Sequence, residues 1–241
     1  MGIAMNLIKP VQRNPVESSG KGDAPDRTGG RRYSFAEELA NSVTHGIGAV
    51  LSIAALAVLL FLACKSGDLW HMVGFGVYGF CLLMLYLSSA LYHAVSGTRI
   101  KTLFRRLDHA SIFLLIAGTY TPVLLIAMRG PWGWSLLALI WTMAAAGLIY
   151  ELIYLGRHKF VSLTIYLAMG WLAIVAIKPM IAILPHGLLY WVVFGGLVYT
   201  AGVVFYVSKC LPFNHAIWHL FVLGGSTLHF IGILIHLTPL S

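Results

Sequence analysis

Seven long apolar segments dominate this sequence and constrain its fold more than any other feature. They cover about residues 39–63, 70–94, 108–128, 132–153, 160–183, 187–208 and 213–237. Each is close to the roughly 20 residues that an α-helix needs to cross the hydrocarbon core of a bilayer. Polar or Gly- and Pro-containing breaks separate them, and the short alternating strands typical of a membrane barrel do not occur in the sequence. We therefore predict an all-α membrane protein with seven transmembrane helices.

The charged residues divide the chain into two parts. Only 10% of the 241 residues are charged, where a soluble globular chain has about 25%. Nine of the charged residues lie within the first 32 positions, among Gly, Pro and Ser. We therefore expect residues 1–33 to form a disordered basic cytoplasmic tail and residues 34–241 to form the seven-helix transmembrane domain. Residues 1–33 contain no continuous apolar stretch, so we expect no cleavable signal peptide.

The distribution of Lys and Arg predicts the orientation of the helices. If the N-terminus is cytoplasmic, 13 of the 16 basic residues lie on the cytoplasmic side and three outside. Because basic residues collect in cytoplasmic loops, the count favours a cytoplasmic N-terminus and an external C-terminus. The net charge of +8 then reports orientation, and we predict no nucleic-acid partner. The three cysteines form no CxxC pair and are expected to be free thiols.

Polar residues within the apolar segments gather at one predicted depth, near the cytoplasmic side. They are Glu38, Asn41 and His45 in the first segment, His93 in the second, Asp108 in the third, and His215 and His219 in the seventh. Ionisable residues inside a membrane are costly and usually face an interior cavity or a partner. Their convergence from several helices on one layer is what a functional site requires.

The histidines have the spacing of a metal site. His215 and His219 are four residues apart, so they share one helical face, and His93 supplies a third imidazole from another helix. Three histidines with one open position are typical of catalytic zinc, where the fourth ligand is water. At the same depth, Asp108 can orient that water. Ser89 lies one turn before His93 and can hydrogen-bond to the water or to a substrate oxygen.

Each of these residues also has a purely structural interpretation. Histidines are common near the ends of membrane helices, and Asp108 can simply favour a helix N-terminus through the dipole. Ser89 can bond a backbone carbonyl within its own helix. A haem pair is disfavoured, because His215 and His219 on one helix cannot take opposite faces of a single haem.

The remaining polar residues allow two interpretations each. Glu38, Asn41 and His45 share one face of the first helix and either line the mouth of a cavity or cap the helix at the interface. His229 faces nearly the same way as the seventh-segment histidines, about four turns deeper, and either contacts a substrate or bonds across helices. Glu151 is expected to pair with the basic cytoplasmic loops.

Four short motifs, in this order on four segments, resemble the bacterial haemolysin III family, the prokaryotic branch of the progestin and adiponectin receptor group. They are Glu37 to Gly46, Ser88 to His93, Leu107 to Ile112, and His215 to His219. The stretch from Asp108 to Pro122 is also similar. The resemblance covers about residues 34–237 and leaves the N-terminal tail outside.

The resemblance implies a seven-helix, adiponectin-receptor-like bundle with a cytoplasmic N-terminus. It also implies a zinc ion near the inner leaflet, with ligands that match His93, His215 and His219. The residues that match the water-holding Asp and the motif Ser are Asp108 and Ser89. Animal relatives are linked to ceramide hydrolysis, and some bacterial members to membrane energetics or fluidity.

We therefore expect an integral protein of the bacterial cytoplasmic (inner) membrane that hydrolyses a lipid amide or ester with Zn²⁺. Zinc would polarise the carbonyl and activate water. An alternative is a zinc-stabilised membrane sensor or homeostasis receptor that binds lipid without turnover. A pore-forming cytolysin is a third hypothesis, and the polar layer near the inner leaflet has no evident purpose in it.

Overall fold

The computed structural model describes residues 33–66, 68–154, 158–208 and 210–238, and these residues form helices without any strand. The elements are α1 (Phe35–Ser66), α2 (Leu69–Ala94), α3 (Thr98–Pro122), the π-helical turn η1 (Val123–Ala127), α4 (Pro131–Tyr154), α5 (Lys159–Gly170), the 3-10 turn η2 (Leu172–Ala176), α6 (Ile177–Ile183), α7 (His186–Val207) and α8 (Asn214–Leu237). Together they make seven spans long and apolar enough to cross a membrane, which confirms the predicted fold class. The predicted tail, residues 1–33, lies outside the described residues except for Tyr33.

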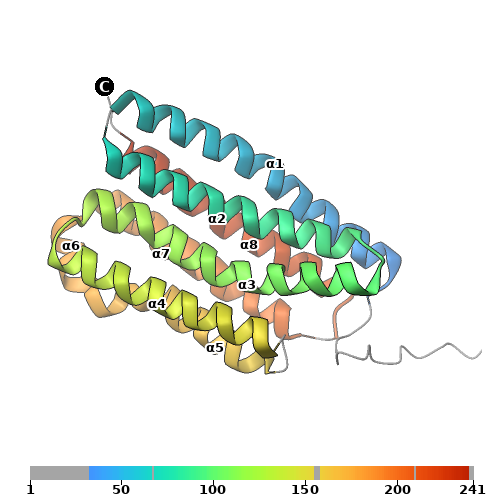
Figure 1. Cartoon of the computed structure of the whole chain (residues 1–241). Helices are drawn as coiled ribbons and strands as arrows, with labels where there is room; N and C mark the ends of the chain where they lie inside the picture. The colour runs from blue at the N-terminus through green and yellow to red at the C-terminus, as the bar shows by residue number, and fades with distance from the viewer. Residues whose placement is uncertain (1–32, 67, 155–157, 209, 239–241) are drawn as a thin grey trace, which may run out of the picture. The chain divides into compact units, whose positions relative to one another are not determined.

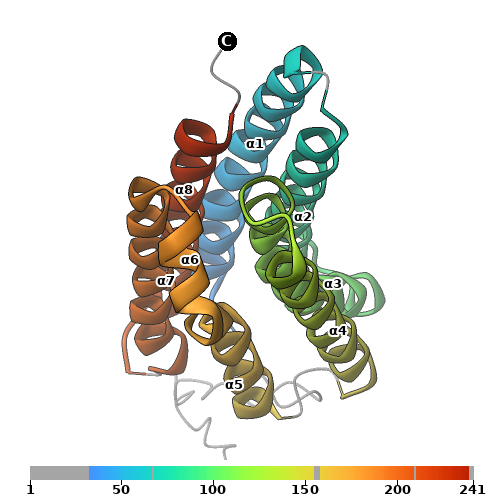
Figure 2. The same ribbon diagram turned by 90° about the vertical axis from the view of Figure 1, so that its left-hand side faces the viewer.

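The helices pack side by side as an up-and-down bundle (Figure 1). α1 packs against α2 and α8, and α7 packs against α8. α3 contacts α2, α4, α5 and α8, so it lies at the centre of the contacts. Figure 2 shows how the helices follow one another around the bundle. We call the end at which α1, α3 and α8 begin and α2 ends the proximal end.

The surface of the bundle is apolar, as a lipid environment requires. Val50, Phe61 and Ile153 are exposed by 67%, 60% and 67%, and they are three of many large apolar side chains on the outside. Histidines, carboxylates and serines are instead buried between the helices. Water would not favour this arrangement, whereas lipid tails solvate the apolar surface and leave polar groups to pair inside. The protein is therefore a multi-pass membrane protein.

The fifth span is broken, although the sequence predicts one continuous helix over residues 160–183. α5 ends at Gly170, and a 3-10 turn precedes α6. The Tyr120 hydroxyl from α3 donates to the carbonyl oxygen of Gly170 at 2.9 Å and accepts from the amide of Ala173 at 3.0 Å. Because these bonds replace the helical ones, the break leaves neither backbone group unpaired in the membrane.

The third span also differs from the prediction, at both of its ends. α3 begins at Thr98, within a stretch that the sequence predicts as a polar break, because hydropathy detects only the part of a helix that lies in lipid. At the other end Pro122 lacks a backbone N–H, and the helix continues as a π-helical turn over Val123–Ala127.

A clasp joins two spans at the distal end of the bundle, opposite the proximal end. The Asp68 carboxylate caps α2 by accepting from the amide of Trp70 at 3.2 Å, and it lies 2.6 Å from Nδ1 of His71. Nε2 of His71 lies 3.0 Å from the carbonyl oxygen of Leu237 at the end of α8. The hydrogen bond to His71 lowers the pKa of the Asp68 carboxyl.

Candidate metal centre

The start of α8 places two histidines at the proximal end of the bundle. Phe213 has a left-handed backbone conformation (φ 55°), which turns the chain from the loop into α8. The side-chain amide of Asn214 donates to the carbonyl oxygen of Ser208 at 2.6 Å and so ties α8 to the end of α7. His215 and His219 follow in the first two turns and point to the same side of the helix.

The third histidine comes from the end of α2. The Ser42 hydroxyl on α1 donates to the carbonyl oxygen of Ala90 at 3.1 Å and fixes α2 against α1 near this point. The ring centroid of His93 lies 5.1 Å from that of His215 and 5.3 Å from that of His219. The rings of His215 and His219 are 4.5 Å apart. Packing of α2 and α8 against α1 therefore gathers three imidazoles from distant parts of the sequence.

These three side chains can hold a metal ion together. One ligand nitrogen from each of His93, His215 and His219 lies within 4.8 Å of the other two. In a tetrahedral site with bonds of about 2.0–2.1 Å, two ligand nitrogens lie about 3.4 Å apart, so small ring movements complete the geometry. Nε2 of His93 and Nε2 of His215 are buried without any hydrogen-bond partner. Buried nitrogens of this kind need a partner, and a metal ion fits the donor set.

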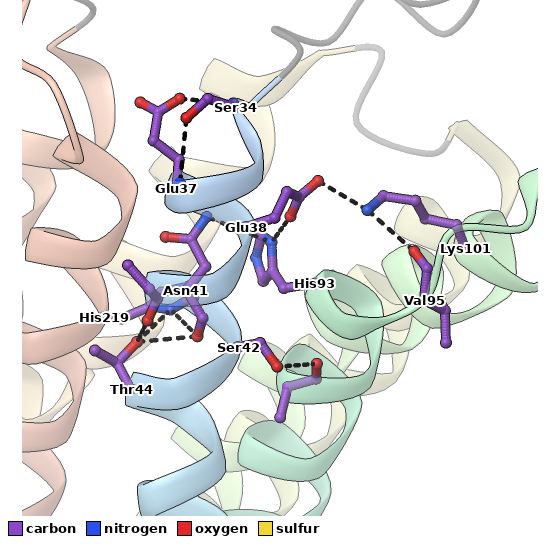
Figure 3. A network of polar contacts seen from close by, with 12 residues as sticks. Ser34, Glu37, Glu38, Asn41, Ser42, Thr44, His93, Val95, Lys101 and His219 are labelled. Carbon is purple, nitrogen blue, oxygen red and sulfur yellow. Dashed lines mark hydrogen bonds and ion pairs between the residues drawn. The ribbon is translucent and has the colours of Figure 1, made fainter.

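An outer carboxylate orients the His93 ring (Figure 3). Oε2 of Glu38 lies 2.6 Å from Nδ1 of His93, and the ring donates because a carboxylate only accepts. Nζ of Lys101 donates to the other carboxylate oxygen of Glu38 at 2.8 Å. A carboxylate on the far nitrogen is the usual support of a metal-binding histidine, since it leaves Nε2 free to bind the ion.

His219 has the same kind of support from the backbone of α1. Its Nδ1 donates to the carbonyl oxygen of Asn41 at 3.2 Å and lies 3.3 Å from Oγ1 of Thr44 (Figure 3). The Thr44 hydroxyl itself donates to the carbonyl oxygen of Ala40 at 2.8 Å. Two of the three rings are therefore held from behind by α1, which fixes the tautomers that a metal ion needs.

A cavity of about 170 Å³ lies beside the triad of His93, His215 and His219. Its polar wall includes His215, His219 and Asp108, and most of the remaining wall is apolar. Asp108 is buried on α3. Ser89 on α2 is also fully buried, and its Oγ has no hydrogen-bond partner among the described residues. The arrangement places the cavity on one side of the three imidazoles, with a buried carboxylate on the same cavity wall.

Comparison with known proteins finds relatives that match most of the chain. Residues 33–230 match the family described as haemolysin-III related. Hemolysin-3 of Bacillus cereus is 49% identical over 203 residues, which cover 84% of this chain and 93% of that protein. The Hemolysin-3 homolog of Bacillus subtilis (strain 168) is 42% identical over 204 residues, or 85% and 96% of the two chains. The chain belongs to the haemolysin III family. The human monocyte to macrophage differentiation factor is 35% identical over 203 residues, which cover 82% of this chain and 83% of that protein. This relative extends the likeness to proteins of the progestin and adiponectin receptor type.

The haemolysin III bundle places the other predicted site residues in two different roles. Glu38 and Asn41 support the rings of the triad rather than line the cavity. His45 lines the cavity, and its ring stacks on that of His219 at 3.5 Å. Neither ring nitrogen of His45 has a hydrogen-bond partner. His229 lines the cavity farther along and bonds across helices through Nε2, 3.0 Å from the carbonyl oxygen of Val192.

Sequence reasoning missed a second polar cluster on the cavity wall. Nδ1 of His109 donates to Oε1 of Glu151 at 2.9 Å, and the Ser162 hydroxyl donates to Oε2 of Glu151 at 2.8 Å. The sequence predicts pairing of Glu151 with the basic loops and assigns no role to His109. An acidic residue at the end of the fourth apolar segment was the signal, because a carboxylate there requires partners from neighbouring helices.

Proposed function

We propose that this protein is a zinc-dependent hydrolase of a lipid amide or ester. The observation that carries the proposal is the grouping of three imidazoles, two of them with unpartnered Nε2 atoms, next to the buried Asp108 on the wall of a largely apolar cavity. Imidazole donors suit zinc, and three of them leave a coordination position open for chemistry. The apolar wall suits the chain of a lipid, whose carbonyl would lie at the polar end.

The proximal end is proposed to face the cytoplasm of a bacterium, so that the site lies near the inner leaflet of the cytoplasmic membrane. The support is the excess of Lys and Arg, 13 against three, in the segments that flank this end. A lipid would then reach the cavity from the inner leaflet.

The residues of the chain divide the work of hydrolysis. A bound zinc ion supplies a Lewis acid and lowers the pKa of water at the site. His93 and His219, held by Glu38 and by the backbone of α1, keep the ion in place. Asp108 accepts the proton of the attacking water while the water oxygen bonds to the carbonyl carbon. It then returns the proton to the leaving nitrogen or oxygen as the C–N or C–O bond breaks. Ser89 offers its hydroxyl to the water or to the developing oxyanion.

Two substitutions test the proposal by separating metal binding from turnover. His219→Ala should remove both the metal and the activity, whereas Asp108→Ala should keep stoichiometric zinc and lose turnover by a factor of about 100 or more. Elemental analysis of the purified protein and release of fatty acid from lipid amides and esters measure the two quantities. His186→Ala is the matched control, because His186 is exposed at the start of α7 on the distal end. Purified protein without stoichiometric zinc would refute the proposal.

Other outcomes distinguish the two remaining functions. Zinc that raises thermal stability without turnover of any lipid would assign the protein to the sensor class. The relative named Hemolysin-3 suggests pore formation, and release of a dye from liposomes that contain the pure protein would support it. Intact liposomes are expected, because His93, His219 and Asp108 are buried between helices rather than arranged along a pore.

A further inference from the structure

The cavity has a second polar corner, built from three helices, that the hydrolytic site does not use. His109 on α3, Glu151 on α4 and Ser162 on α5 all line the cavity. The Glu151 carboxylate accepts a hydrogen bond from Nδ1 of His109 at 2.9 Å and another from the Ser162 hydroxyl at 2.8 Å. His109 follows Asp108 directly in α3, so the two side chains leave neighbouring positions of one helix turn. The corner therefore adjoins the residue that we assign to the attacking water.

The hydrogen bonds of this corner leave one ring nitrogen for a ligand. Glu151 is only 1% exposed and can only accept hydrogen bonds, so Nδ1 of His109 carries the hydrogen of their shared bond. In the neutral ring, Nε2 is then a hydrogen-bond acceptor. The side chain of His109 keeps 19% exposure and lines the cavity. The Tyr166 hydroxyl donates to the backbone carbonyl of His109 at 2.9 Å and holds this part of α3 against α5.

A carboxylate buried inside a membrane bundle is costly. Here Glu151, itself bonded by Ser162, orients one imidazole at the polar end of an apolar cavity. Beyond this corner the cavity is lined by side chains such as Leu115, Ile116 and Val123. A ligand that matches both parts has an apolar chain and, at its head, a group that donates a hydrogen bond.

We propose that His109 is the headgroup subsite of this cavity and selects lipids that carry a hydroxyl next to the amide or ester. The hydroxyl donates to Nε2 of His109, while Glu151 and Ser162 hold the ring. The acyl chain lies along the apolar wall, and the carbonyl lies between Asp108 and the triad of His93, His215 and His219. The inference rests on the proposed function, because it takes the cavity to be the lipid site. His109 acts here as a specificity-determining residue.

A pair of probes that differ in one hydrogen-bond donor tests the subsite. N-Dodecanoylethanolamine carries a terminal hydroxyl, and its O-methyl ether has the same chain and amide without that donor. Equilibrium binding of each probe is measured with zinc-loaded full-length protein in lipid nanodiscs. The wild type should bind the hydroxyl probe about tenfold more tightly, because an unfilled acceptor in a desolvated corner penalises the ether. His109→Phe should bind both probes equally and keep its zinc.

Two further variants make the comparison specific. His109→Gln retains an acceptor and should keep part of the preference. His186→Phe makes the same type of change at an exposed histidine on the distal end and should keep all of it. Equal binding of the two probes by the wild type would overturn the proposal, whether or not His109→Phe folds. A full preference that survives in His109→Phe would overturn it as well.

Because binding and turnover are measured separately, failure of the subsite and failure of the hydrolase can be told apart. A wild type that prefers the hydroxyl probe but cleaves neither probe supports the subsite and counts against hydrolysis. A wild type that cleaves both probes without preference in binding supports hydrolysis and refutes the subsite.

Discussion

Replacement of Glu38 by Gln changes the outermost support of the metal centre without touching a metal ligand. Oε2 of Glu38 accepts the Nδ1 hydrogen of His93 at 2.6 Å, and Oε1 accepts from Lys101 at 2.8 Å. Gln occupies the same volume and its amide oxygen still accepts a hydrogen bond, but the negative charge is lost. The ring of His93 then becomes a weaker ligand and is oriented less firmly.

The size of the effect follows from the kind of bond that is exchanged. A hydrogen bond to a charged group contributes about 1.5–3 kcal/mol, and one between neutral groups about 0.5–1.5 kcal/mol. The Glu38 side chain is 20% exposed and also binds Lys101. We therefore take the smaller difference between a charged and a neutral hydrogen bond, about 1 kcal/mol. Glu38→Gln should therefore weaken zinc binding by roughly fivefold to tenfold.

The assay is competition with a chelator of known affinity, on purified protein in detergent, with the wild type and two variants side by side. Glu37→Gln is the matched control. Glu37 is the neighbouring carboxylate. It makes a capping box with Ser34 and accepts from the amide of Phe213 at 3.4 Å, and none of these bonds reaches a ring of the triad. The control should keep the zinc affinity of the wild type. If Glu38→Gln binds zinc as tightly as the wild type, or if Glu37→Gln loses as much affinity, the assigned role of Glu38 behind the His93 ring is refuted.

Two further predictions concern the packing and the distal clasp. Gly147→Ala should lower the free energy of unfolding by about 1–3 kcal/mol, because the added Cβ would lie 2.3 Å from the Phe113 ring. A lower melting temperature in detergent would report the loss. Gly46→Ala should not lower the melting temperature, because the added Cβ there meets nothing within 4 Å. Equal losses of stability in the two variants would contradict the packing argument. Asp68→Asn should lower the melting temperature at pH 7, and the difference from the wild type should shrink as pH falls below the usual pKa range of a carboxyl. The bond to His71 lowers the folded-state pKa of Asp68, so its stabilisation is present above the unfolded pKa and is lost as pH falls through the folded one. A difference between Asp68→Asn and the wild type that does not depend on pH would contradict this assignment.

The sequence determines the number and approximate position of the spans, because burial of the backbone in lipid requires one apolar helix for each crossing. Motifs such as Ser88 to His93 also indicate the family, and the comparisons confirm that family. The pair His215 and His219 could be recognised as a local ligand pair, since helical geometry alone places residues four apart on one face. These features depend only on local periodicity and on hydropathy.

Tertiary structure decided how the polar residues are combined. Hydropathy gives the depth of a residue in the membrane but not the rotation of its helix, so it could not assign Glu38 to the back of His93 or His109 to Glu151. The break in the fifth span depends on the Tyr120 hydroxyl, which comes from another helix. Rotation and contact between helices arise from side-chain packing across the whole bundle, and only the folded chain brings those side chains together.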